Sequence, residues 1–203
     1  CESTAEVFSV ELNEVSPAIL PSSEVVCVED SPDLISPLVQ SSGDGELGFQ
    51  WFESDSGQGA WTAIPGENGE SFQPPSAEGE EVFYQLQTVS VLHGVECLAV
   101  SEPYHLIINA IDAGFAQSPS EGVCVGGEVV VSSLEYDGPP EQEYSWYVGD
   151  SENGPWSPLQ NETEQNLQLT PSDVGTVWVV AELSGSLLGQ TCSAFGLPVA
   201  ISV

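Results

Sequence analysis

The sequence predicts an all-β protein built from two tandem copies of one β-sandwich, placed end to end. Three observations lead to this prediction. The chain matches itself when it is shifted by about 96 residues, a period that indicates a repeated structural unit. Short runs of alternating apolar and polar residues, bounded by Gly and Pro, are typical of half-buried strands. No segment of the chain has a convincing helical pattern.

The internal match aligns the least common residue types of the chain. The aligned pairs are Cys27 with Cys124, Cys97 with Cys192, Trp51 with Trp146, and Trp61 with Trp156. A third, partial copy is indicated at the N-terminus, because Phe8, Val10 and Leu12 follow Cys1 as Val199, Ile201 and Val203 follow Cys192. This register predicts three parts: 1–12 as the last strand of a preceding repeat, 13–110 as repeat one, and 111–203 as repeat two.

The strands are expected where the alternation is clearest. In repeat one we place them near 17–20, 25–28, 34–39, 47–53, 60–64, 70–73, 81–91 and 98–109. In repeat two we place them near 113–117, 122–135, 142–148, 155–159, 165–170, 176–184 and 193–203. About seven strands in roughly 95 residues is the number that an immunoglobulin-like sandwich contains.

Aromatic residues on these strands identify the expected cores. The predicted core aromatics are Trp51, Trp146, Tyr84 and Trp178. Two further tryptophans, Trp61 and Trp156, follow the first pair at the same spacing in both repeats. We interpret them as side chains that cover a sheet edge, and the alternative is an exposed platform on which a sugar ring stacks.

Five cysteines indicate an oxidising, extracellular setting. The register predicts the disulfides Cys27–Cys97 and Cys124–Cys192, each closing a loop of about 70 residues and contributing roughly 4 kcal/mol. Cys1 is expected to be unpaired in this segment, its partner lying upstream, and the alternative is an acylated N-terminal cysteine. Zinc is the alternative to the disulfides, but close CxxC pairs with neighbouring His are missing from the sequence.

The charge balance excludes several classes of function. The chain has no Lys or Arg against 32 Asp plus Glu, a net charge of −32. P-loops, Schiff-base lysines and arginine phosphate clamps therefore cannot occur. Nucleic acids and anionic membranes would be repelled, so we expect neither as a partner. No apolar run approaches the ~18 residues of a membrane helix, and we expect no membrane insertion.

The acidic surface predicts that stability rises with salt. Repulsion among the carboxylates is screened as the Debye length falls from about 30 Å at 0.01 M to about 3 Å at 1 M ionic strength. We expect the melting temperature to increase with added NaCl, as suits a saline habitat. A melting temperature that falls over this range contradicts the prediction.

Neither histidine belongs to the repeated framework. His93 aligns with Leu188 and His105 aligns with Ala200, and the GxSxG and HExxH motifs of hydrolases are missing from the sequence. We therefore expect no catalytic residues and no enzyme activity. Calcium is the one cofactor considered, since carboxylates are its preferred ligands. The calcium candidates are Asp30, Asp33, Asp44, Asp112 and Asp150.

Several short motifs recur in the two copies. In repeat one they are Gln50-Trp51-Phe52, Trp61-Thr62-Ala63-Ile64, Phe72 before Pro74, and Phe83-Tyr84; in repeat two they are Cys124-Val125-Gly126, Ser145-Trp146-Tyr147, Trp156-Ser157-Pro158-Leu159 and Trp178. Together they resemble the immunoglobulin-like repeats of giant bacterial surface adhesins and gliding-associated proteins exported by the type IX secretion system. Repeat one departs from this pattern at Glu29, where repeat two has Gly126.

The resemblance implies a structural or adhesive role outside the cell. We expect a secreted, cell-surface attached protein that forms a rigid stalk segment of a bacterial filament or giant adhesin. Its expected partners are neighbouring repeats of the same chain, other copies of the filament, or a cell-surface glycan. The alternative function is a carbohydrate- or cell-surface-binding adhesive module.

Overall fold

The structure, a computed structural model, describes residues 9–76, 81–119 and 122–203. Its regular elements are β-strands, and none of the described residues forms a helix long and apolar enough to cross a membrane. In chain order the strands are β1 (Val15–Ser16), β2 (Ser23–Cys27), β3 (Ser42–Gly43), β4 (Glu46–Ser54), β5 (Thr62–Ala63), β6 (Val82–Leu92), β7 (Val95–Val100), β8 (Tyr104–Asn109), β9 (Phe115–Gln117), β10 (Val129–Leu134), β11 (Gln142–Gly149), β12 (Ser157–Pro158), β13 (Asn166–Leu169), β14 (Thr176–Leu187), β15 (Gln190–Phe195) and β16 (Val199–Ser202).

The described residues divide into two compact units. The first contains residues 9–24, 32–75 and 81–107, and the second contains residues 108–119 and 122–203. The segment Val25–Ser31, which the register assigns to repeat one, belongs to the second unit. The domain limits 1–12, 13–110 and 111–203, and the end-to-end placement, stay sequence predictions.

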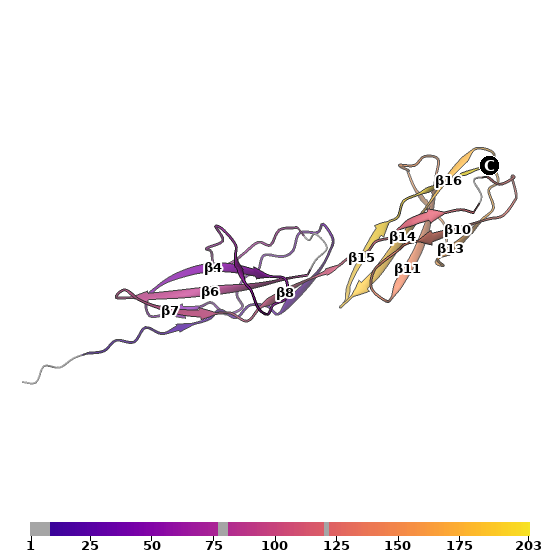
Figure 1. The fold of residues 1–203 in the computed structure, drawn as a ribbon. Helices are drawn as coiled ribbons and strands as arrows, with labels where there is room; N and C mark the ends of the chain where they lie inside the picture. The colour runs from indigo at the N-terminus through magenta and orange to yellow at the C-terminus, as the bar shows by residue number, and fades with distance from the viewer. Residues whose placement is uncertain (1–8, 77–80, 120–121) are drawn as a thin grey trace, which may run out of the picture. The chain divides into compact units, whose positions relative to one another are not determined.

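The first unit is organised by the long strand β6, which pairs with β4 along one edge (Figure 1). Along its other edge β6 pairs first with β8 and then with β7. The complete sheet has the order β2-β8-β6-β4-β5, with β7 on β6. The opposing layer is less regular, because it consists of the pair β1–β3 and of single bridges that join Ile19 to Val39 and Ile35 to Phe72.

The second unit repeats this plan with a more regular second layer. Its larger sheet has the order β12-β11-β14-β15, and β16 also pairs with β14 (Figure 1). The other sheet has the order β13-β10-β9. One apolar core takes buried side chains from both sheets, including Val131, Leu167, Trp146, Val179 and Ile201. The predicted fold class is confirmed: the chain is all-β and forms immunoglobulin-like sandwiches.

A tryptophan lies at the centre of each unit. Trp51 and Trp146 are both fully buried, and their indole nitrogens donate to the equivalent carbonyl oxygens of Gly69 (2.9 Å) and Glu164 (2.8 Å). Each buried indole N–H therefore has a hydrogen-bond acceptor inside an otherwise apolar core. The aromatic packing around Trp51 extends through Phe72.

Prolines shorten several of the expected strands. The stretches 98–109 and 193–203 are each divided in two, because Pro103 and Pro198 have no amide hydrogen to continue the ladder. The stretches 34–39 and 70–73 are reduced to isolated bridges. In 122–135 regular pairing begins only at Val129.

The N-terminal strand was predicted from an alternating pattern. Val10 and Leu12 lie in no strand and are 83 % and 71 % exposed, and Cys1 and Phe8 lie outside the described residues. The equivalent strands β8 and β16 pair with β6 and β14, which precede them in the chain. Residues 9–12 therefore do not form the predicted strand.

Candidate functional site: cysteines and asparagine clamps

The disulfide of this chain joins residues that the register assigns to different repeats. Cys27 is bonded to Cys192, with the two Cα atoms 5.5 Å apart and a sequence separation of 165. Cys97 and Cys124 are free thiols. The predicted bonds Cys27–Cys97 and Cys124–Cys192 are therefore wrong. The reason is that Val25–Ser31 folds with the second unit, whereas Cys97 belongs to the first.

The backbone turns in the same way after Cys27 and after Cys124. The amide of Asp30 donates to the carbonyl oxygen of Cys27 (3.2 Å), and the amide of Gly127 donates to that of Cys124 (2.8 Å). The third residue of each turn is left-handed, with φ of 68° at Glu29 and 74° at Gly126. The turn therefore explains why repeat two has glycine there, since only glycine takes this conformation without steric cost.

Replacing Glu29 by glycine is expected to stabilise the chain by about 0.5–1 kcal/mol. The gain is the relief of the left-handed backbone, reduced by the greater freedom of glycine in the unfolded chain. The free energy of unfolding in urea measures it. Glu29→Gln is the matched control, because it removes the same charge and keeps the strained conformation. Equal stabilisation in both variants contradicts the explanation.

The second cysteine of each repeat occupies one place on one hairpin. Cys97 in β7 stands opposite Ser90 of β6, and Cys192 in β15 stands opposite Gly185 of β14. Both hairpins turn through two residues with positive φ, such as Leu188 (49°) and Gly189 (93°), the conformation of a tight type I′ turn. The bonded and the free cysteine are thus presented by the same local structure.

An asparagine clamps each of these hairpins, and its sequence separation from the hairpin differs by only one residue between the two units. In the first unit the Nδ2 of Asn13 donates to the carbonyl oxygens of Ser90 (2.7 Å) and Val95 (2.8 Å). In the second unit Asn109 donates to those of Gly185 (3.0 Å) and Gln190 (2.9 Å). Sequence analysis missed these residues, although the register aligns them.

The two clamps differ in one hydrogen bond. The Oδ1 of Asn13 accepts from the Oγ of Ser90 at 2.7 Å. Asn109 is 1 % exposed and its Oδ1 has no hydrogen-bond partner among the described residues, because Gly185 occupies the position of that serine. A side chain at Gly185 would meet Pro139, whose Cγ lies 2.6 Å from the site of an added Cβ. Close packing therefore explains the missing bond.

Replacing Asn109 by alanine is expected to destabilise the second unit by about 2 kcal/mol. The buried carbonyl of Gly185 and the carbonyl of the exposed Gln190 both lose their donor, which costs about 1–3 kcal/mol, and removal of the unpaired Oδ1 returns part of it. Urea unfolding measures the loss, and amide exchange should increase in the hairpin of β14 and β15. Asn153→Ala, at an exposed position, is the control. An unchanged hairpin in Asn109→Ala contradicts the clamp.

A second anchor holds the start of β2 in the first unit. The hydroxyl of Tyr104 donates to Oε2 of Glu24 (2.6 Å), and the backbone amide of Asp33 donates to the same carboxylate. Burial and, second, the hydrogen bond to Glu24 raise the pKa of Tyr104 well above its usual value. The phenol therefore stays neutral and continues to donate throughout the physiological range.

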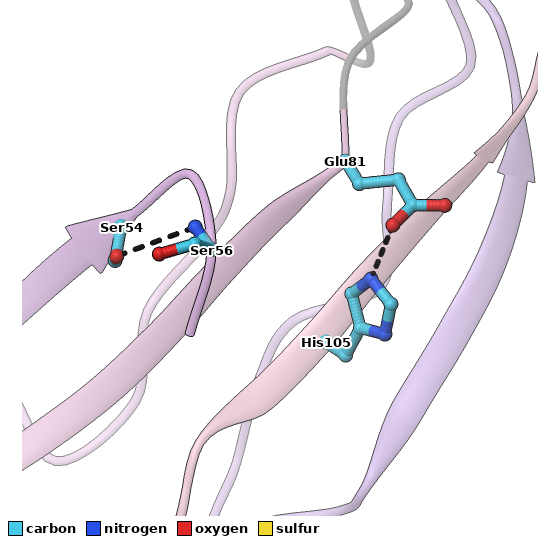
Figure 2. Close-up of polar contacts among 4 residues, drawn as sticks. All are labelled: Ser54, Ser56, Glu81 and His105. Carbon is cyan, nitrogen blue, oxygen red and sulfur yellow. Dashed lines mark hydrogen bonds and ion pairs between the residues drawn. The ribbon is translucent and has the colours of Figure 1, made fainter. Parts of the chain in front are cut away.

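The histidines pair with carboxylates and not with a nucleophile. The Nε2 of His105 lies 3.0 Å from Oε2 of Glu81. Figure 2 shows this pair together with Ser54 and Ser56, where the backbone amide of Ser56 donates to the hydroxyl oxygen of Ser54. The ring of His105 also stacks on Phe83, with centroids 4.1 Å apart. The Nδ1 of His93 lies 3.3 Å from a carboxylate oxygen of Glu11. The imidazole of His105 is therefore paired with a carboxylate and not with either of these serines.

The calcium candidates do not form a metal-binding cluster within the described residues. The Oδ2 of Asp44 accepts from the amide of Glu14 at 2.9 Å, and the Oδ1 of Asp112 accepts from the amide of Gly114 at 2.8 Å. Asp30, Asp33 and Asp150 are exposed. Nowhere within the described residues do three His, Cys, Asp or Glu side chains gather as a metal site would require. Calcium binding stays a prediction.

Of the remaining aromatic candidates, Tyr84 lies in the core of the first unit, whereas the three tryptophans are only half-buried. Tyr84 is 2 % exposed and packs on Phe72, with ring centroids 5.0 Å apart. Trp178 was predicted as a core residue but is only half-buried, because it stands opposite Gly149 on the other face of its sheet from the buried Val179. Trp61 and Trp156 are half-buried too. The ring of Trp156 covers Gly149, which is consistent with packing over the sheet.

Comparison with known proteins adds little to this geometry. No protein-family model matches the chain, and no curated protein matches it. Solved structures built from immunoglobulin domains do match. The N-terminal four Ig domains of Dscam1 isoform 6.9 share 13 % identity over 94 % of this chain and 45 % of that one, with a TM-score of 0.38. The N-terminal four Ig domains of Dscam1 isoform 4.44 share 12 % identity over 96 % of this chain and 48 % of that one, with a TM-score of 0.37.

The amphioxus IgVJ-C2 molecule shares 15 % identity over 89 % of this chain and all of that one, with a TM-score of 0.36. This chain spans about half the length of the Dscam1 structures that it matches. Because the TM-scores are low, the fold assignment rests on the strand order and the cores described above, and the function is argued from the cysteines.

Proposed function

We propose that the chain is a structural segment of an extracellular bacterial surface filament or adhesin stalk, with no enzymatic activity. One observation carries the proposal: Cys27 of repeat one is covalently bonded to Cys192 of repeat two. Tension applied to the chain termini passes through this bond, which excludes from the load the long stretch of backbone between its ends, a sequence separation of 165 residues. That property suits a protein that is pulled.

Two further features support an extracellular setting. Disulfides persist in oxidising compartments, and this one closes a ring over most of the chain. The net charge of −32, with no Lys or Arg, keeps neighbouring acidic fibres apart and soluble. The resemblance to adhesins of the type IX secretion system makes a bacterial surface the proposed location. The proposed partners are adjoining repeats.

Immunogold microscopy of unpermeabilised cells with an antibody against the purified chain tests this function. The expected result is label along extended surface fibres. The purified chain is expected not to bind a glycan array. A surface without label, on cells that are labelled only after permeabilisation, contradicts the proposal. Saturable glycan binding that is lost in Trp61→Ala or Trp156→Ala favours a carbohydrate-binding module instead.

A further inference from the structure

The two free cysteines are the counterparts of the two bonded ones. Cys124 aligns with Cys27, and Cys97 aligns with Cys192. The observed bond joins the first cysteine of one repeat to the second cysteine of the repeat that follows. If the free cysteines follow the same pattern, the disulfide partner of Cys124 is the second cysteine of a later repeat. The disulfide partner of Cys97 is then the first cysteine of an earlier repeat. A second copy of the chain presents both kinds of partner, with Cys97 as a second cysteine and Cys124 as a first cysteine.

Each free cysteine has the same local backbone structure as its bonded counterpart. Cys124 is exposed and is followed by the same hydrogen-bonded turn as Cys27. Cys97 is half-exposed and lies on a hairpin that Asn13 clamps as Asn109 clamps that of Cys192. Cys192, which is bonded, is only 5 % exposed.

The residues beside the free thiols are apolar and exposed. In the second unit Val28, next to Cys27, lines one hollow with Ser193 and Ala194. The counterparts of Val28 and Ser193 are Val125, which is 50 % exposed, and Leu98, which is 57 % exposed. A bond between Cys124 and Cys97 of two copies would place these two apolar side chains together, and burying them would favour the contact.

We propose that Cys124 of one copy of this chain forms a disulfide with Cys97 of the next copy, repeating the Cys27–Cys192 bond at each step of a head-to-tail array. The proposal rests on the stalk function argued above. The two thiols transfer two electrons and two protons to a small-molecule disulfide such as oxidised glutathione, which leaves as two thiols. The net change is one new S–S bond between copies.

The test uses Cys1→Ser as the parent, because Cys1 is a third thiol in the register of Cys97. Two variants are made in it: Cys97→Ser, which retains Cys124, and Cys124→Ser, which retains Cys97. They are mixed in equal amounts with a glutathione redox buffer and ~1 M NaCl, where repulsion between the acidic chains is screened to about 3 Å. Non-reducing electrophoresis and peptide mass spectrometry identify the bonds formed.

The expected product is a reducible dimer in which Cys124–Cys97 exceeds nine tenths of the new bonds, while each variant alone stays monomeric. The parent is expected to form a reducible ladder. A random mixture, in which only half of the dimers join unlike thiols, overturns the proposal. So does a parent that closes Cys97–Cys124 within one chain, or one that forms no new bond. These outcomes leave the immunogold test of the stalk function unaffected.

Discussion

Pulled from its two termini, the oxidised chain is expected to straighten to a contour of only about 130 Å, against about 700 Å after reduction, at roughly 3.5 Å per residue. The difference arises because tension passes through the Cys27–Cys192 bond and bypasses the backbone between these residues. Single-molecule force spectroscopy with handles at the termini measures both lengths.

The same measurement distinguishes the two ways of pairing the cysteines. Bonds Cys27–Cys97 and Cys124–Cys192 would leave the segment between Cys97 and Cys124 free to straighten, and the oxidised contour would be about 220 Å. The double variant Cys97→Ser with Cys124→Ser is the control, and its contour is expected to equal that of the unaltered chain. A contour near 700 Å without reductant contradicts the disulfide.

Replacing both Cys27 and Cys192 by serine is expected to destabilise the second unit by about 5 kcal/mol. In the chain-entropy model this is the stabilisation from closing a loop of 165 residues, and it lies at the upper end of measured values. Tryptophan fluorescence in a background with Trp51→Phe and Trp61→Phe, which leaves only the tryptophans of the second unit, follows the urea unfolding of that unit.

The matched control for this loss is again the pair of free cysteines. Because Cys97 and Cys124 form no bond within the chain, replacing both by serine should change the free energy of unfolding by less than about 0.5 kcal/mol, as for ordinary surface sites. If the Cys27/Cys192 and the Cys97/Cys124 double variants have equal free energies of unfolding, the Cys27–Cys192 bond contributes nothing to stability.

Much of the fold could be predicted from the sequence because it depends on local patterns. The alternation around Trp51 and Trp146 places each tryptophan on the buried face of a strand, and the repeat register shows that the two positions are equivalent. The limits of the strands depend on where an amide hydrogen is missing. Pro103 and Pro198 divide stretches whose apolar alternation is continuous.

The cysteine pairing could not be predicted because the register identifies equivalent positions but not which copy supplies the partner. Four cysteines allow three connectivities, and the prediction assumed that each repeat closes on itself. The structure instead places Val25–Ser31 in the second unit. The clamps were missed for a related reason: a single asparagine such as Asn109 has no pattern that distinguishes it from a turn residue.

The Cys27–Cys192 ring has a consequence for survival after cleavage. A protease that cuts the backbone once, anywhere between these cysteines, opens the ring but leaves both pieces joined. In an array with the proposed Cys124–Cys97 bonds, each copy is joined to its neighbours at two positions that both lie inside its own ring. A single cut in a ring therefore leaves the copies on either side connected, and releasing the distal part of a fibre needs one cut between Cys97 and Cys124 and a second cut elsewhere in the same ring.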